Sequence, residues 1–211
     1  MDISKPTLGY WKIRGLAQQI RYIFEFLKVP YDEVLYEVGD APDYSKDAWN
    51  SVKQKLGFDF PNLPYLIDGD LRITESQAIL RYVVNKYGKE LLGKTPEDQA
   101  LADQLYLILT DINYSLEGMK KVNDYMTGKT YAVGDYITYV DFQFLETLEF
   151  VSWITEEDVF CIFPKLQEYY NRMRDIPQIK EYMQSEKFIM LKFNNGHAKI
   201  NTNPSIVKAT Y

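Results

Sequence analysis

Cysteine and histidine are almost absent from the 211-residue sequence, which holds one of each, Cys161 and His197. A single cysteine cannot form a disulfide within the chain, and no cluster of Cys and His marks a zinc site, so no metal is expected. The same scarcity excludes a Cys-x-x-Cys redox enzyme and a hydrolase that relies on a Ser-His or Cys-His pair.

Long apolar runs and clusters of basic residues are missing as well. No apolar stretch reaches the roughly 18 residues of a membrane-spanning helix, and the N-terminus lacks a signal-peptide pattern. The net charge is −6, the pI is about 5.0, and the Lys and Arg residues are scattered. Because phosphate backbones require clustered positive charge, neither nucleic acid nor a membrane is expected as a partner. A reducing, cytoplasmic location is expected.

The N-terminal part of the chain alternates between strand and helix patterns. Strands are predicted over residues 7–11, 31–38, 65–67 and 71–74, and helices over residues 17–27, 46–56 and 76–87. Strands separated by helical crossovers predict an α/β unit of about 80 residues. Tyrosine is abundant, with 18 residues, which suggests tyrosine-lined surfaces or pockets.

The C-terminal part reads as helical throughout. Thr95 and Pro96 form a strong helix start after a short linker, and the next proline is Pro164. Thr138 and Asp141 have the spacing of a capping box, which makes Asp141 a structural residue rather than a general base. Further helices are expected after Pro164 and Pro177, and a loose polar tail beyond about residue 196.

The stretch from Phe60 to Ser76 combines a turn, a hairpin and a helix start. The Leu63–Pro64 bond is a candidate cis bond. Asp68-Gly69 between two apolar runs predicts a tight hairpin whose two central residues both have positive φ. The second strand leads into Ser76 at a helix N-terminus, whose unpaired N–H groups attract a carboxylate or phosphate. Read alone, the stretch is an anchor for a small anionic ligand, although Ser76 would serve equally as a helix cap.

Several motifs together resemble the cytosolic glutathione transferases, and the mu class in particular. They are LGYWKIRGL (8–16), GDAPDY (39–44), FPNLPYLIDG (60–69), ITYVDF (137–142) and FPKL (163–166). The resemblance implies a thioredoxin-like βαβαββα domain with a mixed sheet over residues 1–88 and a linker over 89–95. An all-α domain over 96–211 would then carry the hydrophobic substrate site and the tail.

The same resemblance implies an enzyme that conjugates the thiolate of glutathione, its cosubstrate, to hydrophobic electrophiles. Tyr10 corresponds to the catalytic tyrosine whose hydroxyl binds the sulfur. The implied glutathione-binding residues are Tyr10, Trp11, Leu16, Lys46, Trp49, Lys53, Asn62, Leu63, Pro64, Glu75, Ser76 and Asp111.

Within that set, each end of the tripeptide has its own implied partners. Trp49 and Lys53, with Lys46 in the same region, would hold the glycine carboxylate, and the Leu63 main chain would pair with the cysteinyl backbone. Ser76 would bind the γ-glutamyl carboxylate. Asp111 would reach the γ-glutamyl amine across a homodimer, although it also fits an ordinary surface acid.

The resemblance also implies a second, apolar site and a dimer contact. The hydrophobic substrate site would comprise Trp11, Leu16, Tyr114, Gly118 and Lys121. Phe60 corresponds to an aromatic side chain that inserts into the partner subunit.

The sequence departs from the mu-class pattern at three places: Glu75, the region from Gly118 to Gly134, and the tail after Phe188, which resembles the family only loosely. Glu75 stands where the class has glutamine, which adds a negative charge beside the ligand carboxylate. The region from Gly118 to Gly134 is about twenty residues, or five to six helical turns, shorter. The first two departures keep an alternative open: a ligand-binding or structural protein of the same fold with little or no turnover.

Overall fold

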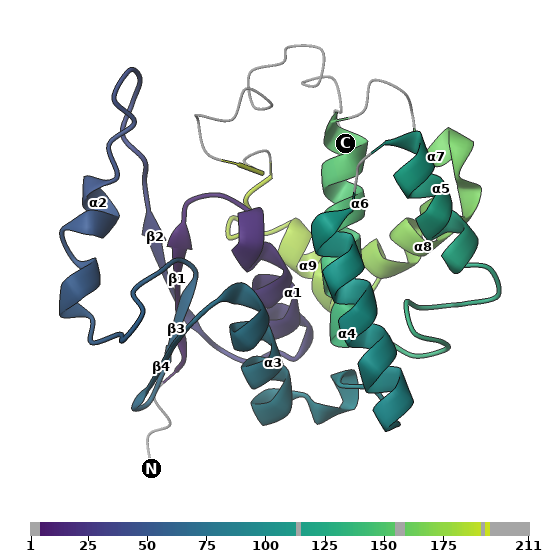
Figure 1. Ribbon diagram of the computed structural model, residues 1–211, viewed down its shortest axis with the longest axis horizontal. Helices are drawn as coiled ribbons and strands as arrows, with labels where there is room; N and C mark the ends of the chain where they lie inside the picture. Colours follow the sequence, from purple (N-terminus) through teal and green to yellow (C-terminus); the bar gives the residue numbers. More distant parts are fainter. Residues whose placement is uncertain (1–4, 113–114, 155–158, 191–192, 195–211) are drawn as a thin grey trace. The chain divides into compact units, whose positions relative to one another are not determined.

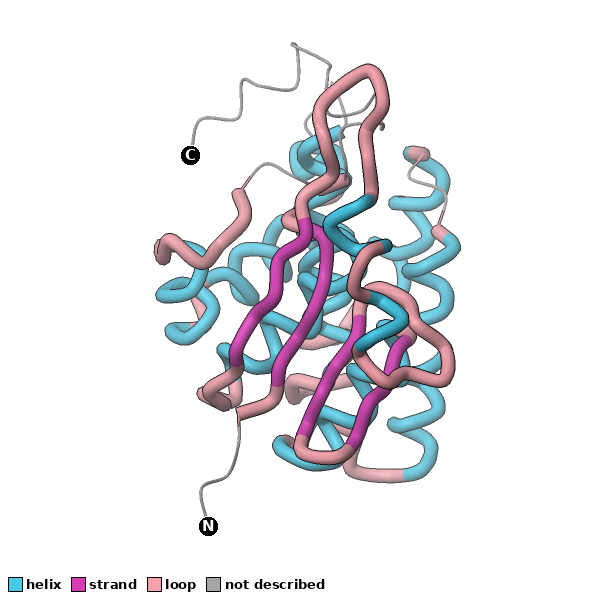
Figure 2. Tube along the Cα trace, turned by 90° about the vertical axis from the view of Figure 1, so that its left-hand side faces the viewer, coloured by secondary structure: helices cyan, strands magenta, loops and turns pink. Residues whose placement is uncertain are grey.

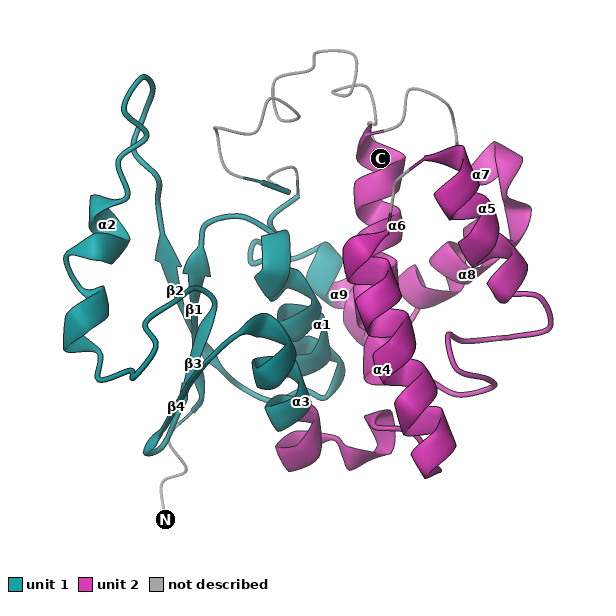
Figure 3. Cartoon of the chain, in the orientation of Figure 1, with its two compact units in different colours: residues 1–83, 182–203 teal, residues 84–181, 204–211 magenta. Residues whose placement is uncertain are grey.

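The computed structural model describes residues 5–112, 115–154, 159–190 and 193–194 (Figure 1). By its contacts the chain divides into two compact units, residues 1–83 with 182–203 and residues 84–181 with 204–211 (Figure 3). The domain boundaries expected from the sequence, at residues 88 and 96, stay a prediction. The expected tail beyond residue 196 and His197 lie outside the described residues.

The first unit contains a four-stranded mixed sheet, as the sequence predicts. Its strands are β1 (Thr7–Trp11), β2 (Asp32–Tyr36), β3 (Tyr65–Asp68) and β4 (Leu71–Thr74), in the spatial order β2-β1-β3-β4 (Figure 2). β1 pairs with β2 in parallel, whereas the β1–β3 and β3–β4 pairs are antiparallel. The parallel pair requires a crossover, which α1 (Gln18–Phe26) provides.

Helices cover both faces of this sheet. α1 and α3 (Ser76–Tyr87) lie on one face, and α2 (Asp47–Asn50) lies on the other (Figure 1). Side chains along β1 alternate between the two faces of the sheet. Leu8 is fully buried on one face, and Gly9 has no side chain on the other face, where the Tyr65 ring lies. A Cβ on Gly9 would lie 2.1 Å from the ring of Tyr65. Glycine is therefore required where the Tyr65 ring crosses β1.

Two elements are shorter than the sequence predicts. The strand expected over residues 31–38 spans only Asp32–Tyr36. The helix expected over residues 46–56 is the short α2 followed by a separate 3₁₀ turn, Lys53–Lys55. Trp49 is the one buried residue in α2, so no apolar stripe stabilises a longer helix there.

The β3–β4 hairpin forms where expected, but with a different turn. Asp68 pairs with Leu71, so the two central residues are Gly69 and Asp70. Gly69 has a φ of +61°, whereas Asp70 does not have a positive φ. The prediction of two positive-φ residues is thus wrong, because a turn that begins with glycine needs only the first. The Leu63–Pro64 bond is cis, as predicted, and so is Ala41–Pro42.

The described part of the second unit is helical, as predicted. After a 3₁₀ turn at Lys89–Leu91, its helices are α4 (Pro96–Asp111), α5 (Leu116–Tyr125), α6 (Tyr139–Ile154), α7 (Val159–Ile162), α8 (Pro164–Arg174) and α9 (Pro177–Met183). α6 packs against α4, α7 and α8 and is the most deeply buried of them. The helix α7 was not predicted from the sequence. None of the helices in the described residues is long and apolar enough to cross a membrane.

Asp141 organises the start of α6. One carboxylate oxygen accepts hydrogen bonds from the Thr138 N–H and hydroxyl at 2.8 and 3.0 Å. The other accepts from the Ala132 N–H and the Tyr169 hydroxyl, both at 2.8 Å. Burial raises the pKa of Asp141 to about 6, against the opposing effect of these hydrogen bonds. The contacts agree with the structural role expected for Asp141.

Candidate functional site

Tyr10, near the end of β1, is buried with a hydroxyl held by the following loop. Its side chain is 6% exposed, and its hydroxyl oxygen accepts a hydrogen bond from the Leu16 N–H at 3.1 Å. A hydroxyl that accepts one hydrogen bond keeps its own proton for donation. The loop therefore fixes the oxygen while the proton remains available to a ligand.

The environment of Tyr10 keeps its phenol neutral. Burial raises the pKa of Tyr10 above its usual value, while the Leu16 N–H and the positive charge of Arg21 lower it to a lesser extent. The phenol consequently acts as a hydrogen-bond donor at physiological pH, not as a base. A neutral donor suits an anion such as a thiolate, since hydrogen bonds to a charged acceptor are the stronger ones.

The loop after β1 is shaped by a glycine and a buried arginine. Gly15 has a φ of +41°, and a Cβ there would lie 2.7 Å from the Tyr10 hydroxyl oxygen. Arg21 is fully buried and donates to the main-chain oxygens of Ile13 and Arg14 at 2.9 and 3.3 Å. Its charge is balanced by Glu33, 2.6 Å from Nε. These residues hold the backbone that meets Tyr10.

The cis-proline turn and the helix start share one hydrogen-bond chain. The Leu63 N–H donates to Asn62 Oδ1 at 2.9 Å, and Asn62 Nδ2 donates to Glu75 Oε1 at 3.1 Å. Glu75 has a φ of +70°, an uncommon conformation for a residue with a side chain, and Ser76 begins α3 directly after it. The structure thus brings Asn62, Leu63, Pro64, Glu75 and Ser76 together at the start of α3, where Glu75 is exposed and Ser76 is partly exposed.

The α2 region supplies one aromatic residue and two lysines. The indole of Trp49 stacks on Tyr65 at 5.9 Å and meets the edge of Tyr36 at 5.3 Å, so its ring is held against the sheet. Lys46 is exposed and Lys53 is partly exposed. Within the described residues neither lysine has an ion-pair partner, so both charges remain available to a ligand carboxylate.

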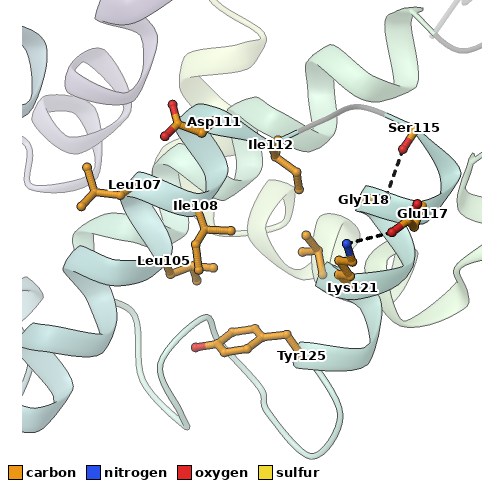
Figure 4. A pocket seen from close by; sticks show the side chains of 11 residues that line it. Leu105, Leu107, Ile108, Asp111, Ile112, Ser115, Glu117, Gly118, Lys121 and Tyr125 are labelled. Carbon is orange, nitrogen blue, oxygen red and sulfur yellow. Dashed lines mark hydrogen bonds and ion pairs between the residues drawn. The ribbon is translucent and has the colours of Figure 1, made fainter.

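A separate cavity lies within the second unit, between α4 and α5. It has a volume of about 620 Å³, and Asp111, Gly118 and Lys121 line it among mostly apolar side chains (Figure 4). Asp111 is the last residue of α4, and the Lys121 ammonium pairs with Glu117 at 2.9 Å. Tyr114, expected in the hydrophobic site, lies outside the described residues.

Sequence reasoning missed two groups of residues at these sites. The first comprises the apolar lining of the cavity: Leu105, Leu107, Ile108, Ile112, Val122 and Tyr125. Leu105, Ile108 and Ile112 recur at helical spacing along α4, which was the available signal. The second comprises Arg14, Gly15 and Arg21, which support Tyr10. No local sequence pattern distinguished Arg14 and Arg21 from surface charges.

The sheet order, the cis-proline before β3 and the helix that starts after β4 together define a thioredoxin-like domain, which is followed, in the described residues, by a helical part. Two family models match the chain: "Glutathione S-transferase, N-terminal domain" over residues 6–85 and "Glutathione S-transferase, C-terminal domain" over residues 82–186. The chain belongs to the glutathione S-transferase family.

Curated relatives of the mu class match most of the chain. Mouse Glutathione S-transferase Mu 2 is 39% identical over 204 residues, and the alignment covers 87% of this chain and 92% of the relative. Rat Mu 4 is 40% identical with the same coverage. The class-mu 26 kDa isozyme of Schistosoma japonicum is 37% identical over 207 residues, covering 87% of this chain and 90% of the relative.

Solved structures of the family have the same fold. The glutathione S-transferase Blo t 8 matches with a TM-score of 0.75 at 27% identity, covering 86% of this chain and 93% of the other. The pi-class glutathione S-transferase of Onchocerca volvulus matches with a TM-score of 0.72 at 26% identity, covering 84% and 91%. In the described residues no group of three or more His, Cys, Asp or Glu side chains is placed to hold a metal ion.

Proposed function

We propose that this protein is a glutathione transferase that joins the glutathione thiolate to hydrophobic electrophiles. The observation that carries the proposal is the neutral, buried Tyr10 hydroxyl, which accepts from the Leu16 N–H and retains its proton for donation. Family membership supports glutathione as the cosubstrate. A cytoplasmic location suits a reaction that consumes a reduced thiol.

The chemistry that Tyr10 would perform is stabilisation of the thiolate. A free thiol has a pKa of about 8.5, so only a few per cent is ionised near neutral pH. Lowering that pKa by about two units requires roughly 2.7 kcal/mol of preferential stabilisation of the anion. The Tyr10 O–H would donate to the sulfur, and the thiolate would then form a C–S bond as the electrophile's leaving group departs with the bonding electron pair.

The remaining residues of the first unit would anchor the tripeptide. The unpaired N–H groups at the start of α3 and the Ser76 hydroxyl suit the γ-glutamyl carboxylate. The ammonium groups of Lys46 and Lys53 and the indole N–H of Trp49 suit the glycine carboxylate. The main chain of Leu63 suits the cysteinyl backbone. For that pairing the ligand would replace the Asn62 side chain, which now accepts from the Leu63 N–H.

Each complete site is proposed to need a second copy of the chain. Phe60 is 81% exposed, so its ring is accessible to a partner subunit. Asp111 at the end of α4 would contribute to the partner's γ-glutamyl amine. Trp11, Leu16, Gly118, Lys121 and Tyr114 remain proposed residues of the electrophile site.

Conjugation of an activated aryl chloride by wild type and by Tyr10→Phe tests the proposal. We expect kcat/KM to fall about 100-fold in the variant, the rate equivalent of the pKa shift above, with little change in glutathione binding. Tyr31→Phe is the matched control, because this half-buried tyrosine stacks on Phe24 in the same unit. Equally slow turnover by wild type and Tyr10→Phe would contradict the proposal.

A second function, glutathione binding without turnover, is favoured by Glu75 and by the 10-residue length of α5. The exposed Glu75 carboxylate precedes Ser76 and opposes a ligand carboxylate there. Retention of the protein on immobilised glutathione, combined with no conjugation of several aryl and alkyl electrophiles, would establish this alternative.

A further inference from the structure

The C-terminal segment, defined here by residues 182–190 and 193, belongs to the first unit although it follows the second in sequence (Figure 3). The Tyr182 hydroxyl accepts from Gln18 Nε2 at 3.3 Å, and its ring meets the edge of Tyr22 at 5.7 Å. Lys187 pairs with Glu25 at 3.6 Å. These contacts attach the segment along α1.

The end of the segment surrounds Arg14 in the loop after β1. The guanidinium lies 4.8 Å from the centre of the Phe188 ring and 4.2 Å from that of Phe193. It donates to the Tyr22 hydroxyl at 3.0 Å and to the Met190 main-chain oxygen at 3.4 Å. Arg14 is fully buried, and a buried cation is tolerated only while such partners hold it.

The same segment also binds the loop backbone directly. The Gly15 N–H donates to the main-chain oxygen of Phe193 at 3.1 Å. The next residue, Leu16, donates its N–H to the Tyr10 hydroxyl. Two consecutive N–H groups therefore link the C-terminal segment on one side to the reactive tyrosine on the other.

We infer that Phe193 and Arg14 are positioning residues, through which the C-terminal segment sets the loop that holds the Tyr10 hydroxyl. The inference rests on the proposed role of Tyr10. Residues more than 170 positions from Tyr10 in sequence then determine how far the pKa of the bound glutathione thiol is lowered. Arg21 also holds the loop, through the main-chain oxygens of Ile13 and Arg14, so loss of the segment should shift the loop without unfolding it.

The test compares Phe193→Ala, Phe193→Leu and the control Lys187→Ala with wild type. Lys187 lies on the same segment but contacts Glu25 and Tyr31, away from the loop. Amide hydrogen exchange at Leu16, measured without any ligand, reports the loop directly. We expect exchange at Leu16 to accelerate about tenfold in Phe193→Ala, less in Phe193→Leu, and not in Lys187→Ala.

A second measurement connects the loop to chemistry. The pKa of the glutathione thiol bound to each variant is followed by the ultraviolet absorbance of the thiolate. We expect Phe193→Ala to raise that pKa by roughly half a unit to one unit, with the dissociation constant of glutathione within about twofold of wild type. A merely structural role would weaken binding or stability and leave the thiol pKa where it was.

The two hypotheses fail in different ways. Unchanged Leu16 exchange in both Phe193 variants overturns the inference whatever the activity. Accelerated Leu16 exchange with an unchanged thiol pKa also overturns the inference, because the position of the loop would then have no effect on the hydrogen bond from Tyr10 to the sulfur. If wild type itself neither binds nor conjugates glutathione, the proposed function fails, while the exchange experiment still decides whether the segment positions the loop.

Discussion

Gly15 has a left-handed backbone conformation and lies directly beside the proposed catalytic hydroxyl of Tyr10. Its φ of +41° disfavours any side chain, and an added Cβ would press on the Tyr10 hydroxyl oxygen. We predict that Gly15→Ala destabilises the protein by about 1–2 kcal/mol from backbone strain, with a further loss from the clash. Conjugation activity should fall more steeply than stability.

Gly128 supplies the matched control for that prediction. It has a φ of +77° but nothing within 4 Å of an added Cβ. Gly128→Ala should therefore show the backbone cost alone, with normal activity at temperatures where the variant stays folded. Chemical denaturation and steady-state kinetics measure both effects. Equal loss of activity in the two variants would show that contact with Tyr10 is unimportant.

Asp141 gives the protein a pH dependence of stability that runs opposite to the usual carboxylate. Its pKa is raised from 3.8 to about 6 by burial, so the folded chain binds this proton more tightly than the unfolded chain. The protonation of Asp141 therefore contributes to the free energy of unfolding. This contribution is fully present below about pH 4 and is lost as the pH rises through about 6.

Substitution of Asp141 isolates this contribution. Asp141→Asn replaces one of the two acceptor oxygens by an NH2 group, which leaves one pair of donors without an acceptor, and should cost roughly 2 kcal/mol or more at any pH. Since the wild-type protein gains stability from Asp141 at low pH, the difference between the two proteins should be larger at pH 4.5 than at pH 7.5. Urea unfolding at both values measures it. A difference that grows toward neutral pH would show that the carboxylate is ionised at low pH.

At the scale of the element, α4 depends on a cap that the sequence already indicates. The Thr95 hydroxyl oxygen accepts from the Asp98 N–H at 3.1 Å, and Pro96 occupies the first turn. We predict that Thr95→Ala lowers the free energy of unfolding by about 1 kcal/mol, because an N–H at the helix start loses its partner.

Thr110, near the other end of α4, is the control. Its hydroxyl donates to the Tyr106 main-chain oxygen inside the helix, so it caps nothing. Thr110→Ala should be neutral or slightly stabilising, since alanine is the better helix former. Thermal unfolding of both variants makes the comparison, and equal destabilisation would remove the case for the cap.

At the scale of the whole molecule, Phe60 is the side chain on which the proposed dimer depends. Phe60→Ser removes an exposed aromatic ring without disturbing a packed core, so the monomer fold should persist. We expect the dissociation constant of the dimer to rise about tenfold or more, the usual consequence of removing an aromatic anchor. Sedimentation over a range of concentrations measures it.

Ile162→Ser tests whether any exposed apolar residue has the same effect. Ile162 is 44% exposed in α7, well separated in sequence from the proposed contact. Its substitution should leave self-association unchanged. Dimers of equal strength in wild type and Phe60→Ser would show that the subunits associate through other surfaces.

Local sequence determined the elements of this protein and their order. Proline positions, helix caps and apolar periodicity act over a few residues, and they correctly predicted the starts of α3, α4, α8 and α9 and the cis bond at Pro64. Motif resemblance also predicted Tyr10, Leu63 and Ser76 as members of one site, which stays a prediction. The predictions were less accurate for the length of α2 and for the hairpin turn. α2 is short because only Trp49 is buried, and the hairpin turn needs one positive φ rather than two.

Only the tertiary structure revealed what holds Tyr10 in place. Arg14 and Arg21 look like ordinary surface charges in the sequence, yet both are fully buried, held by rings, carbonyls and a carboxylate from distant positions. The apolar lining of the α4–α5 cavity is likewise set by the pairing of two helices. The physical reason is that burial of a charge or a groove depends on contacts between residues far apart in the chain, which no local pattern encodes.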